Sequence, residues 1–161
     1  MGRTVIEGTG SGAGRRFAVV VSKYHDFVTS RLERGALAAL DAAGVGSDDV
    51  TVVRVPGAFE LPAAAHLAAK THKFDAVVCL GCLVRGATPH FDFIAAAVAH
   101  GLTSASAATG VPIAFGVLTT NSVEEALERA ADDPSNKGWE AAAAAIEMAA
   151  VAQHINRAGA P

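Results

Sequence analysis

Charged residues are scarce in this chain of 161 residues, at 18%, and basic residues form no long run. Thirteen Lys and Arg against sixteen Asp and Glu leave a net charge of -3, which argues against nucleic-acid binding driven by counterion release. No apolar run is long enough to span a bilayer, and the N-terminus lacks the apolar core of a signal peptide. We therefore expect a cytoplasmic protein that binds neither nucleic acid nor membrane.

Cysteine is nearly absent too, since Cys79 and Cys82 are the only two and lie within one apolar run. No second pair completes a zinc site, and a redox pair would normally open a helix rather than occupy a strand. We interpret both as small buried residues and expect no bound metal. Aromatic residues make up only 6% of the chain, and the single tyrosine, Tyr24, falls between two predicted elements.

Hydrophobic residues are abundant, at 51%, which is enough for the core of one domain. We place that domain at residues 16–156, after a Gly-rich arm at 1–15 that we expect to be flexible, and before a short tail at 157–161. The glycines of the arm precede the first strand, whereas a dinucleotide-binding loop must follow one. They therefore do not indicate a nucleotide site.

Apolar runs alternate with segments of helical periodicity along the domain. The continuous run at 17–22 predicts a strand buried on both faces, as in a parallel sheet, and further strands are expected at 50–55, 76–84 and 112–120. Helices are expected at 30–43, 59–70, 89–109, 123–131 and 139–156, with Ser30 and Glu33 as a capping box and Thr88 as a cap. This order predicts the α/β class, as a flavodoxin-like three-layer α/β/α sandwich with a four-stranded parallel sheet of order 2-1-3-4.

Sheets of this kind bind ligands beyond the carboxyl ends of their strands, where the strand order reverses. The segments at those ends are 24–25, 57–60, 86–90 and 119–121. Because the first and third strands are predicted neighbours, Tyr24 and the turn at 86–90 should face one crevice. Tyr24 suits the stacking of a flat heterocycle there, although plain packing is the simpler interpretation.

The turn at 86–90 leads into a helix N-terminus, whose free N–H groups and positive dipole end suit an anion. Thr88 adds a hydroxyl, and His90 in the first helical turn suits general acid–base catalysis. The simpler alternatives are a turn capped by Thr88 and a His90 whose ring is bonded to backbone. Asp92 is expected to complement the dipole or to hold the loop.

Two cationic residues further along are also candidates. Arg129 follows Glu125 by four residues, so a surface ion pair is the simple alternative to ligand binding. Lys137 lies in a predicted polar loop at 132–138, where it could be an ordinary solvated lysine.

Four stretches carry a resemblance to a known family: VPGAFELP at 55–62, LGCLVRGATPHFDF at 80–93, FGVLTT at 115–120 and NKGWE at 136–140. Through them, residues 16–156 resemble the 6,7-dimethyl-8-ribityllumazine synthase family. The resemblance implies the penultimate step of riboflavin biosynthesis. In that step 5-amino-6-(D-ribitylamino)uracil condenses with 3,4-dihydroxy-2-butanone 4-phosphate to give 6,7-dimethyl-8-ribityllumazine, phosphate and water, with no cofactor.

The resemblance also implies a role for individual residues. His90 would be the acid–base residue. Phosphate would be bound by Ala87, Thr88, Arg129 and Lys137. The ribitylamino-pyrimidine would be bound by Tyr24, Ala58, Phe59, Glu60, Cys82, Leu83, Val84 and Phe115. Tyr24 stands where the family usually has Phe or Trp, and Cys82 stands where a small aliphatic residue is usual.

Assembly follows from the same resemblance, which implies pentamers whose sites lie between subunits, with Phe115 and Arg129 supplied by the neighbour. Twelve pentamers in a hollow shell are expected, and riboflavin synthase is a candidate partner. A non-catalytic flavin- or pteridine-binding shell protein of the same fold is the alternative, but it would not need both His90 and Arg129. A flavodoxin-type electron carrier or a phospho-receiver domain would need other residues than KYHD at 23–26.

Overall fold

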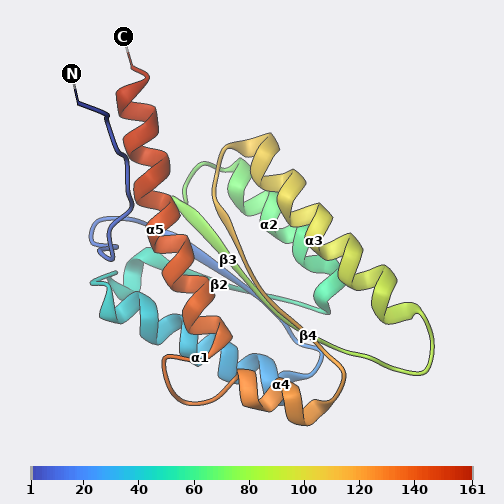
Figure 1. The fold of residues 1–161 in the computed structure, drawn as a ribbon. Coiled ribbons are helices and arrows are strands. Elements are labelled where there is room, and N and C mark those ends of the chain that lie inside the picture. The colour runs from blue at the N-terminus through green and yellow to red at the C-terminus, as the bar shows by residue number, and fades with distance from the viewer. Residues whose placement is uncertain (1, 161) are drawn as a thin grey trace.

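The computed structural model describes residues 2–160 and has a parallel sheet of order β2-β1-β3-β4 between two layers of helices (Figure 1). The strands are β1 (Phe17–Ser22), β2 (Val50–Val55), β3 (Ala76–Val84) and β4 (Ile113–Thr120). The predicted class, layering and strand order are confirmed. The first three strands have the predicted bounds, and β4 begins one residue later than predicted.

Burial explains why the two central strands are unbroken apolar runs. All six residues of β1 and the first seven of β3 are buried, because helices cover both faces of the sheet. β2 and β4 form the two edges and are more exposed. The β4 edge is therefore a surface at which another chain could pair or pack.

The helices are α1 (Asp26–Ala42), α2 (Leu61–Lys70), α3 (His90–Thr109), α4 (Val123–Arg129) and α5 (Lys137–Ala158). Short 3-10 turns, η1 (Ser47–Asp49) and η2 (Ala58–Glu60), precede β2 and α2. α2 and α3 cover one face of the sheet, whereas α1 and α5 cover the other, with α4 beside them (Figure 1). None of the helices in residues 2–160 has the length and apolarity needed to cross a membrane.

The predicted starts of α1, α2 and α3 are wrong. α2 begins at Leu61 and not at 59, because the turn η2 occupies Ala58–Glu60, and neither α1 nor α3 has a side-chain cap. α1 begins at Asp26, because the chain turns at His25 and the His25 carbonyl accepts the Val28 N–H at 2.9 Å. Ser30 thus lies inside α1 and forms no capping box. α3 begins at His90 after Pro89, so Thr88 does not cap it.

The last helix is longer than predicted. The buried Asn136 side chain accepts hydrogen bonds from the N–H groups of Gly138 and Trp139, at 2.7 and 3.2 Å, so α5 begins at Lys137. Lys137 is therefore a helical residue, and its predicted place in a loop is wrong. Ser122 caps α4, with the Glu125 N–H donating to its hydroxyl at 3.2 Å.

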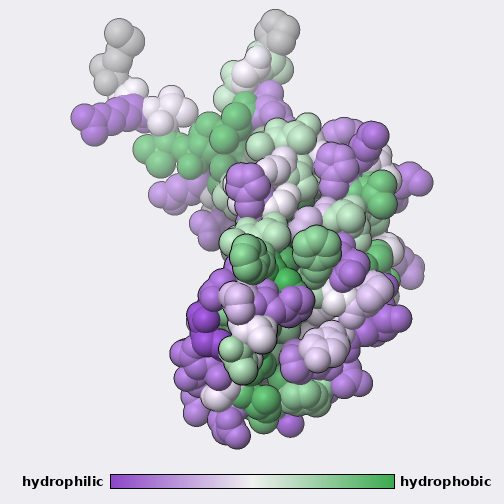
Figure 2. Space-filling model, turned by 90° about the vertical axis from the view of Figure 1, so that its right-hand side faces the viewer, coloured by the Kyte–Doolittle hydropathy of each residue, from purple (hydrophilic) through white to green (hydrophobic). Residues whose placement is uncertain are grey.

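The N-terminal arm has no helix or strand between residues 2 and 15 and runs beside α5 (Figure 1). The Gly12 N–H donates to the Ala43 carbonyl at 2.9 Å, which ties the base of the arm to the end of α1. Further out, Val5 is 73% exposed, and Figure 2 shows apolar residues on a chain end that projects from the body. The flexibility of the arm stays a prediction.

Candidate functional site

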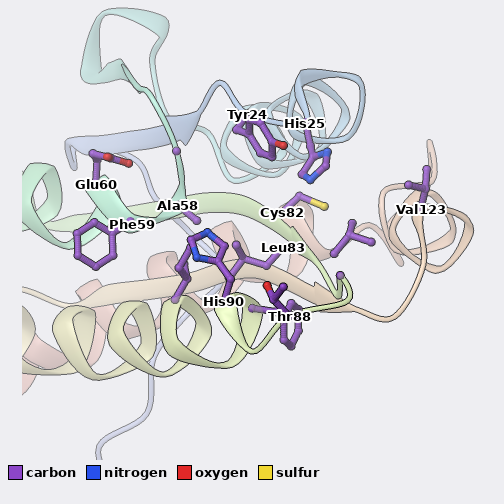
Figure 3. A pocket seen from close by; sticks show the side chains of 15 residues that line it. Tyr24, His25, Ala58, Phe59, Glu60, Cys82, Leu83, Thr88, His90 and Val123 are labelled. Carbon is purple, nitrogen blue, oxygen red and sulfur yellow. The ribbon is translucent and has the colours of Figure 1, made fainter.

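A crevice of about 770 Å³ opens at the carboxyl ends of the strands, where the strand order reverses. The segments that follow β1, β2 and β3 form its walls, as predicted (Figure 3). Its lining consists of Tyr24, His25, Gly57, Ala58, Phe59, Glu60, Cys82, Leu83, Val84, Gly86, Thr88, His90, Phe91, Ile94 and Val123. We refer to this space as the crevice. The fourth predicted segment, 119–121 at the end of β4, does not line it, and Thr119 faces a different hollow.

Nine of the thirteen predicted site residues line the crevice: Tyr24, Ala58, Phe59, Glu60, Cys82, Leu83, Val84, Thr88 and His90. A tenth, Ala87, lies in the same turn, between two lining residues. In Figure 3 the Tyr24 ring and the Ala58–Glu60 segment lie opposite Thr88 and His90. The crevice thus has an aromatic wall and a polar wall, with β3 between them.

Phe115, Arg129 and Lys137 lie elsewhere, in a second hollow of about 390 Å³ beside β4. We call it the β4 hollow; it is bounded by the strand itself, the end of α4 and the start of α5. One chain therefore does not bring these three residues to the crevice. This arrangement is the one expected if two chains complete one site.

The turn between β3 and α3 keeps its polar groups free. Thr88 is exposed and makes no capping bond, so the simpler interpretation of it as an N-cap is wrong. Among residues 2–160, the N–H groups of Ala87 and Thr88 have no backbone acceptor. At Gly86 an added Cβ would meet nothing within 4 Å, which leaves open space beside these donors. Such a turn can receive an anion.

The His90 imidazole is exposed in the first turn of α3 and points toward Ala58 on the facing wall (Figure 3). Within the described part of the chain, neither ring nitrogen has a hydrogen-bond partner. The alternative of a structural histidine bonded to backbone is therefore wrong. The ring is free to give or take a proton from a ligand in the crevice.

Arg85, which the sequence analysis did not single out, holds this turn in place. Its guanidinium pairs with the Asp92 carboxylate at 3.1 Å, donates to the Asn121 side chain at 3.2 Å and lies 4.4 Å from the centre of the Phe91 ring. Its backbone N–H donates to the Thr120 carbonyl at 2.8 Å. Asp92 therefore holds the loop, which is one of its two expected roles.

Burial keeps the β3 wall of the crevice uncharged. It raises the pKa of the Cys82 thiol to about 11 and also raises the pKa of Cys79, so both stay protonated near neutral pH. Both cysteines are free and buried, as predicted. Cys82 therefore presents a small neutral surface to a ligand.

His25 also lines the crevice, and the sequence analysis assigned it no role. It has a left-handed backbone, with φ 60° and ψ 47°, and its ring centre lies 4.4 Å from that of Tyr24. Burial lowers the pKa of this half-buried imidazole. Its sequence signal was weak, because only its place directly after β1 pointed to the site.

The two cations of the β4 hollow differ in their partners. The Arg129 guanidinium donates to the Glu125 carbonyl at 3.0 Å and forms no ion pair within residues 2–160, so the simple alternative of a pair with the Glu125 carboxylate is wrong. Lys137 pairs with both carboxylate oxygens of Glu140, at 3.0 and 2.8 Å. In the same part of the chain, no three His, Cys, Asp or Glu side chains are grouped to hold a metal ion.

Comparison with known proteins finds a matching family model and many relatives, of which two are described here. The family model described as 6,7-dimethyl-8-ribityllumazine synthase matches residues 14–153. A 6,7-dimethyl-8-ribityllumazine synthase of Syntrophus aciditrophicus is 51% identical over 152 residues, which are 94% of this chain and 99% of the relative. A protein of the same name from Desulfatibacillum aliphaticivorans is 46% identical over 151 residues, which are 94% and 97% of the two chains.

Proposed function

The chain belongs to the 6,7-dimethyl-8-ribityllumazine synthase family, and we propose that the crevice is where it performs the family's reaction. The enzyme is a transferase of riboflavin biosynthesis. It condenses 5-amino-6-(D-ribitylamino)uracil with 3,4-dihydroxy-2-butanone 4-phosphate to give 6,7-dimethyl-8-ribityllumazine, phosphate and water. The non-catalytic shell protein of the same fold is not favoured, because both relatives carry the name of the synthase.

One observation carries the placement of this chemistry. The crevice joins an aromatic wall to an imidazole and a hydroxyl that have no protein partners. The reaction begins when the amine of the pyrimidine attacks the ketone, and loss of water then forms an imine. Phosphate is eliminated next, and ring closure releases a second water. These steps need proton transfers and a place for phosphate, which suits the groups on the polar wall.

His90 is the residue that transfers protons in this proposal, because its free ring faces the space in which the two substrates meet. The phosphate occupies the turn at Ala87 and Thr88, whose N–H groups are free. The pyrimidine ring stacks on Tyr24, which is 68% exposed. The ring and its ribityl chain are held by Ala58, Phe59, Glu60, Cys82, Leu83 and Val84.

Phe115, Arg129 and Lys137 complete the site from a neighbouring subunit. They lie in a separate hollow at an edge strand, where a second chain can bring them to the crevice of the first. Large exposed apolar side chains, among them Phe93 at 73% and Phe115 at 47%, are of the kind that subunit contacts cover. We propose pentamers, and a hollow shell of twelve pentamers in which riboflavin synthase is a candidate partner. A cytoplasmic location stays a prediction.

The test is to incubate the purified chain with both substrates. Formation of the lumazine chromophore and release of phosphate should proceed together, at one phosphate per lumazine. Native mass spectrometry of the same sample should give multiples of five subunits. Absence of turnover in a folded, assembled sample would contradict the enzymatic proposal, and active monomers would contradict the shared site.

A further inference from the structure

A hollow of about 680 Å³ lies at the amino ends of β3 and β4, at the opposite end of the sheet from the crevice. The turns before these two strands and the C-terminal half of α5 enclose it, at the end of the molecule where the arm runs beside α5 (Figure 1). We call it the amino-end hollow; Phe74 and Val111 give it an apolar part, and its polar residues include His72, Asp75, Asn156 and Arg157. Its size suits a small organic molecule.

Arg157 gives this hollow an unpaired positive charge. It is the one lysine or arginine in the lining, and it forms no ion pair or side-chain hydrogen bond within residues 2–160. The negative end of the helix dipole favours a cation in the last turn of α5, but that interaction leaves the guanidinium N–H groups unbonded. They are therefore available to a phosphate or carboxylate, which a guanidinium can bind through two parallel hydrogen bonds.

Further donors line the same hollow. The side chains of His72 and Asn156 have no hydrogen-bond partner in the described part of the chain. His72 also has a left-handed backbone, with φ 55°, and strain of this kind is often kept at functional sites. The Gln153 carbonyl oxygen accepts the Arg15 guanidinium at 2.7 Å, which leaves the Gln153 NH2 group as another donor. Donors from the turn after α2 and from α5 thus line one space.

Acceptors are few by comparison. Asp75 is the one carboxylate in the lining among residues 2–160, and one of its oxygens already accepts the Arg16 backbone N–H at 2.8 Å. Within the same residues, no three His, Cys, Asp or Glu side chains are grouped to hold a metal ion. Arg15, which is bonded to Gln153, brings a second positive charge next to the lining. The balance of charges and donors therefore favours an anion over a cation.

We propose that the amino-end hollow binds a small organic anion, with Arg157 as the main ligand of its phosphate or carboxylate group. Side-chain donors of Gln153, Asn156 and His72 bind the remaining oxygens, and Phe74 packs against the apolar part of the molecule. This site is separate from the proposed phosphate position in the crevice, because the two lie at opposite ends of the strands. Binding there does not require the reaction proposed for the crevice.

Equilibrium dialysis against inorganic phosphate and, separately, against citrate measures binding without using the enzymatic activity. Arg157→Gln removes the charge and should weaken the binding of at least one probe at this site roughly tenfold, the lower end for a hydrogen bond to a charged group. Asp75→Asn removes the carboxylate, although its amide oxygen can still accept the Arg16 N–H, and should strengthen that binding roughly 2- to 5-fold. Phosphate bound in the crevice should be unaffected by either substitution.

Arg31→Gln is the matched control, because Arg31 is exposed on α1, forms no ion pair within residues 2–160 and lies outside the crevice and both hollows. It should bind both probes as the native protein does, and melting temperatures verify that each variant is folded. A loss confined to Arg157→Gln supports the proposal, and the probe that shows it identifies the charged group of the ligand. Unchanged binding in Arg157→Gln would overturn the proposal, as would equal losses in Arg157→Gln and Arg31→Gln or weaker binding in Asp75→Asn. None of these outcomes depends on turnover, so the site and the proposed function can fail separately.

Discussion

The imidazole of His90 stands in the first turn of α3 with no hydrogen-bond partner among the described residues, and the protonated Cys82 thiol lies on the β3 wall. Burial keeps the thiol protonated, whereas the exposed His90 ring is free to give or take a proton from a ligand in the crevice. Proton transfer in the crevice is therefore expected to depend on His90.

Replacing His90 by Ala should lower kcat by roughly 10- to 10⁴-fold, the contribution of a positioned acid–base group. Affinity for the pyrimidine should change far less, because the stacking wall is untouched. Steady-state kinetics with both substrates measure the two effects separately. His100→Ala is the control, as His100 is exposed on the same helix and lies outside the crevice. Full activity in His90→Ala would remove His90 from the mechanism.

Within the described part of the chain, the Ser22 side chain is buried without a hydrogen-bond partner. It is 1% exposed, and its hydroxyl is the one buried side-chain oxygen in residues 2–160 that has no partner. It lies at the end of β1, and a Cβ built on Gly81 would be 3.2 Å from its oxygen. Burying an unpaired hydroxyl costs roughly 1–3 kcal/mol. Ser22 is thus a site where the loss of a polar atom should not harm folding.

Ser22→Ala should leave the free energy of unfolding unchanged or raise it by about 1 kcal/mol, because it removes the unpaired hydroxyl without deleting packed carbon. Denaturant unfolding measures this. Thr120→Val gives the opposite case, since the buried Thr120 hydroxyl donates to the Ser122 carbonyl at 2.9 Å, and its loss should destabilise by about 1 kcal/mol. Equal destabilisation by both substitutions would show that Ser22 has a partner after all.

Among the secondary-structure elements, the start of α3 is held to the end of β4 by the Arg85 side chain. It bonds Asp92 on the helix and Asn121 after the strand, and it covers the Phe91 ring. The pair with Asp92 is about half exposed, so it adds only about 0.2–1 kcal/mol to the free energy of unfolding. Because the Arg85–Asp92 pair lies beside the Ala87–Thr88 turn, we expect it to affect the position of that turn more than the stability of the fold.

Asp92→Asn should therefore raise the KM for the butanone phosphate several fold while melting temperature and kcat change little. The loosened Arg85 no longer fixes the turn that receives the phosphate, whereas the pyrimidine wall is unaffected. Asp49→Asn breaks a comparable surface pair, 3.6 Å from Arg16 and away from the crevice, and should leave both KM values unchanged. A rise in both KM values for Asp92→Asn would indicate a general disturbance of the fold in place of a positioning role.

In the molecule as a whole, the crevice and the β4 hollow are separate, so one chain does not bring the residues of both together. His90 lies in the first and Arg129 in the second, so in a ring of identical subunits each site would take its Arg129 from the next chain. Loss of either residue from every subunit should then inactivate every site. Mixed rings, in contrast, should contain some intact sites.

Unfolding His90→Ala and Arg129→Ala proteins together at equal ratio and refolding them should restore roughly a quarter of the native activity. A site is intact when one neighbour supplies His90 and the other Arg129, each with a chance of about one half in a head-to-tail ring. Activity of the co-refolded sample measures the recovery, and each variant refolded alone is the control. Rings that prove mixed by mass spectrometry but stay as inactive as the parents would contradict the shared site.

Local patterns were sufficient for much of this fold. The continuous apolar runs predicted β1 and β3 residue for residue, because a strand buried on both faces admits no polar alternation. The bounds of the edge strand β2 were also predicted correctly, although Thr51 and Arg54 interrupt its apolar residues. The helix starts were less predictable. Ser30 and Glu33 have the spacing of a capping box, but the backbone at His25 had already started α1 four residues earlier.

The sequence by itself determined the fold class, the strand order and the edge of the sheet at which the crevice opens, because strand ends of a parallel sheet converge at one edge whatever the details of packing. Tertiary structure alone decided three things. It turned His25 into the crevice, it joined Arg85 to Asp92 and Asn121, and it put Arg129 in a separate hollow. Each of these depends on where segments distant in sequence meet, and no spacing within one element encodes such a meeting.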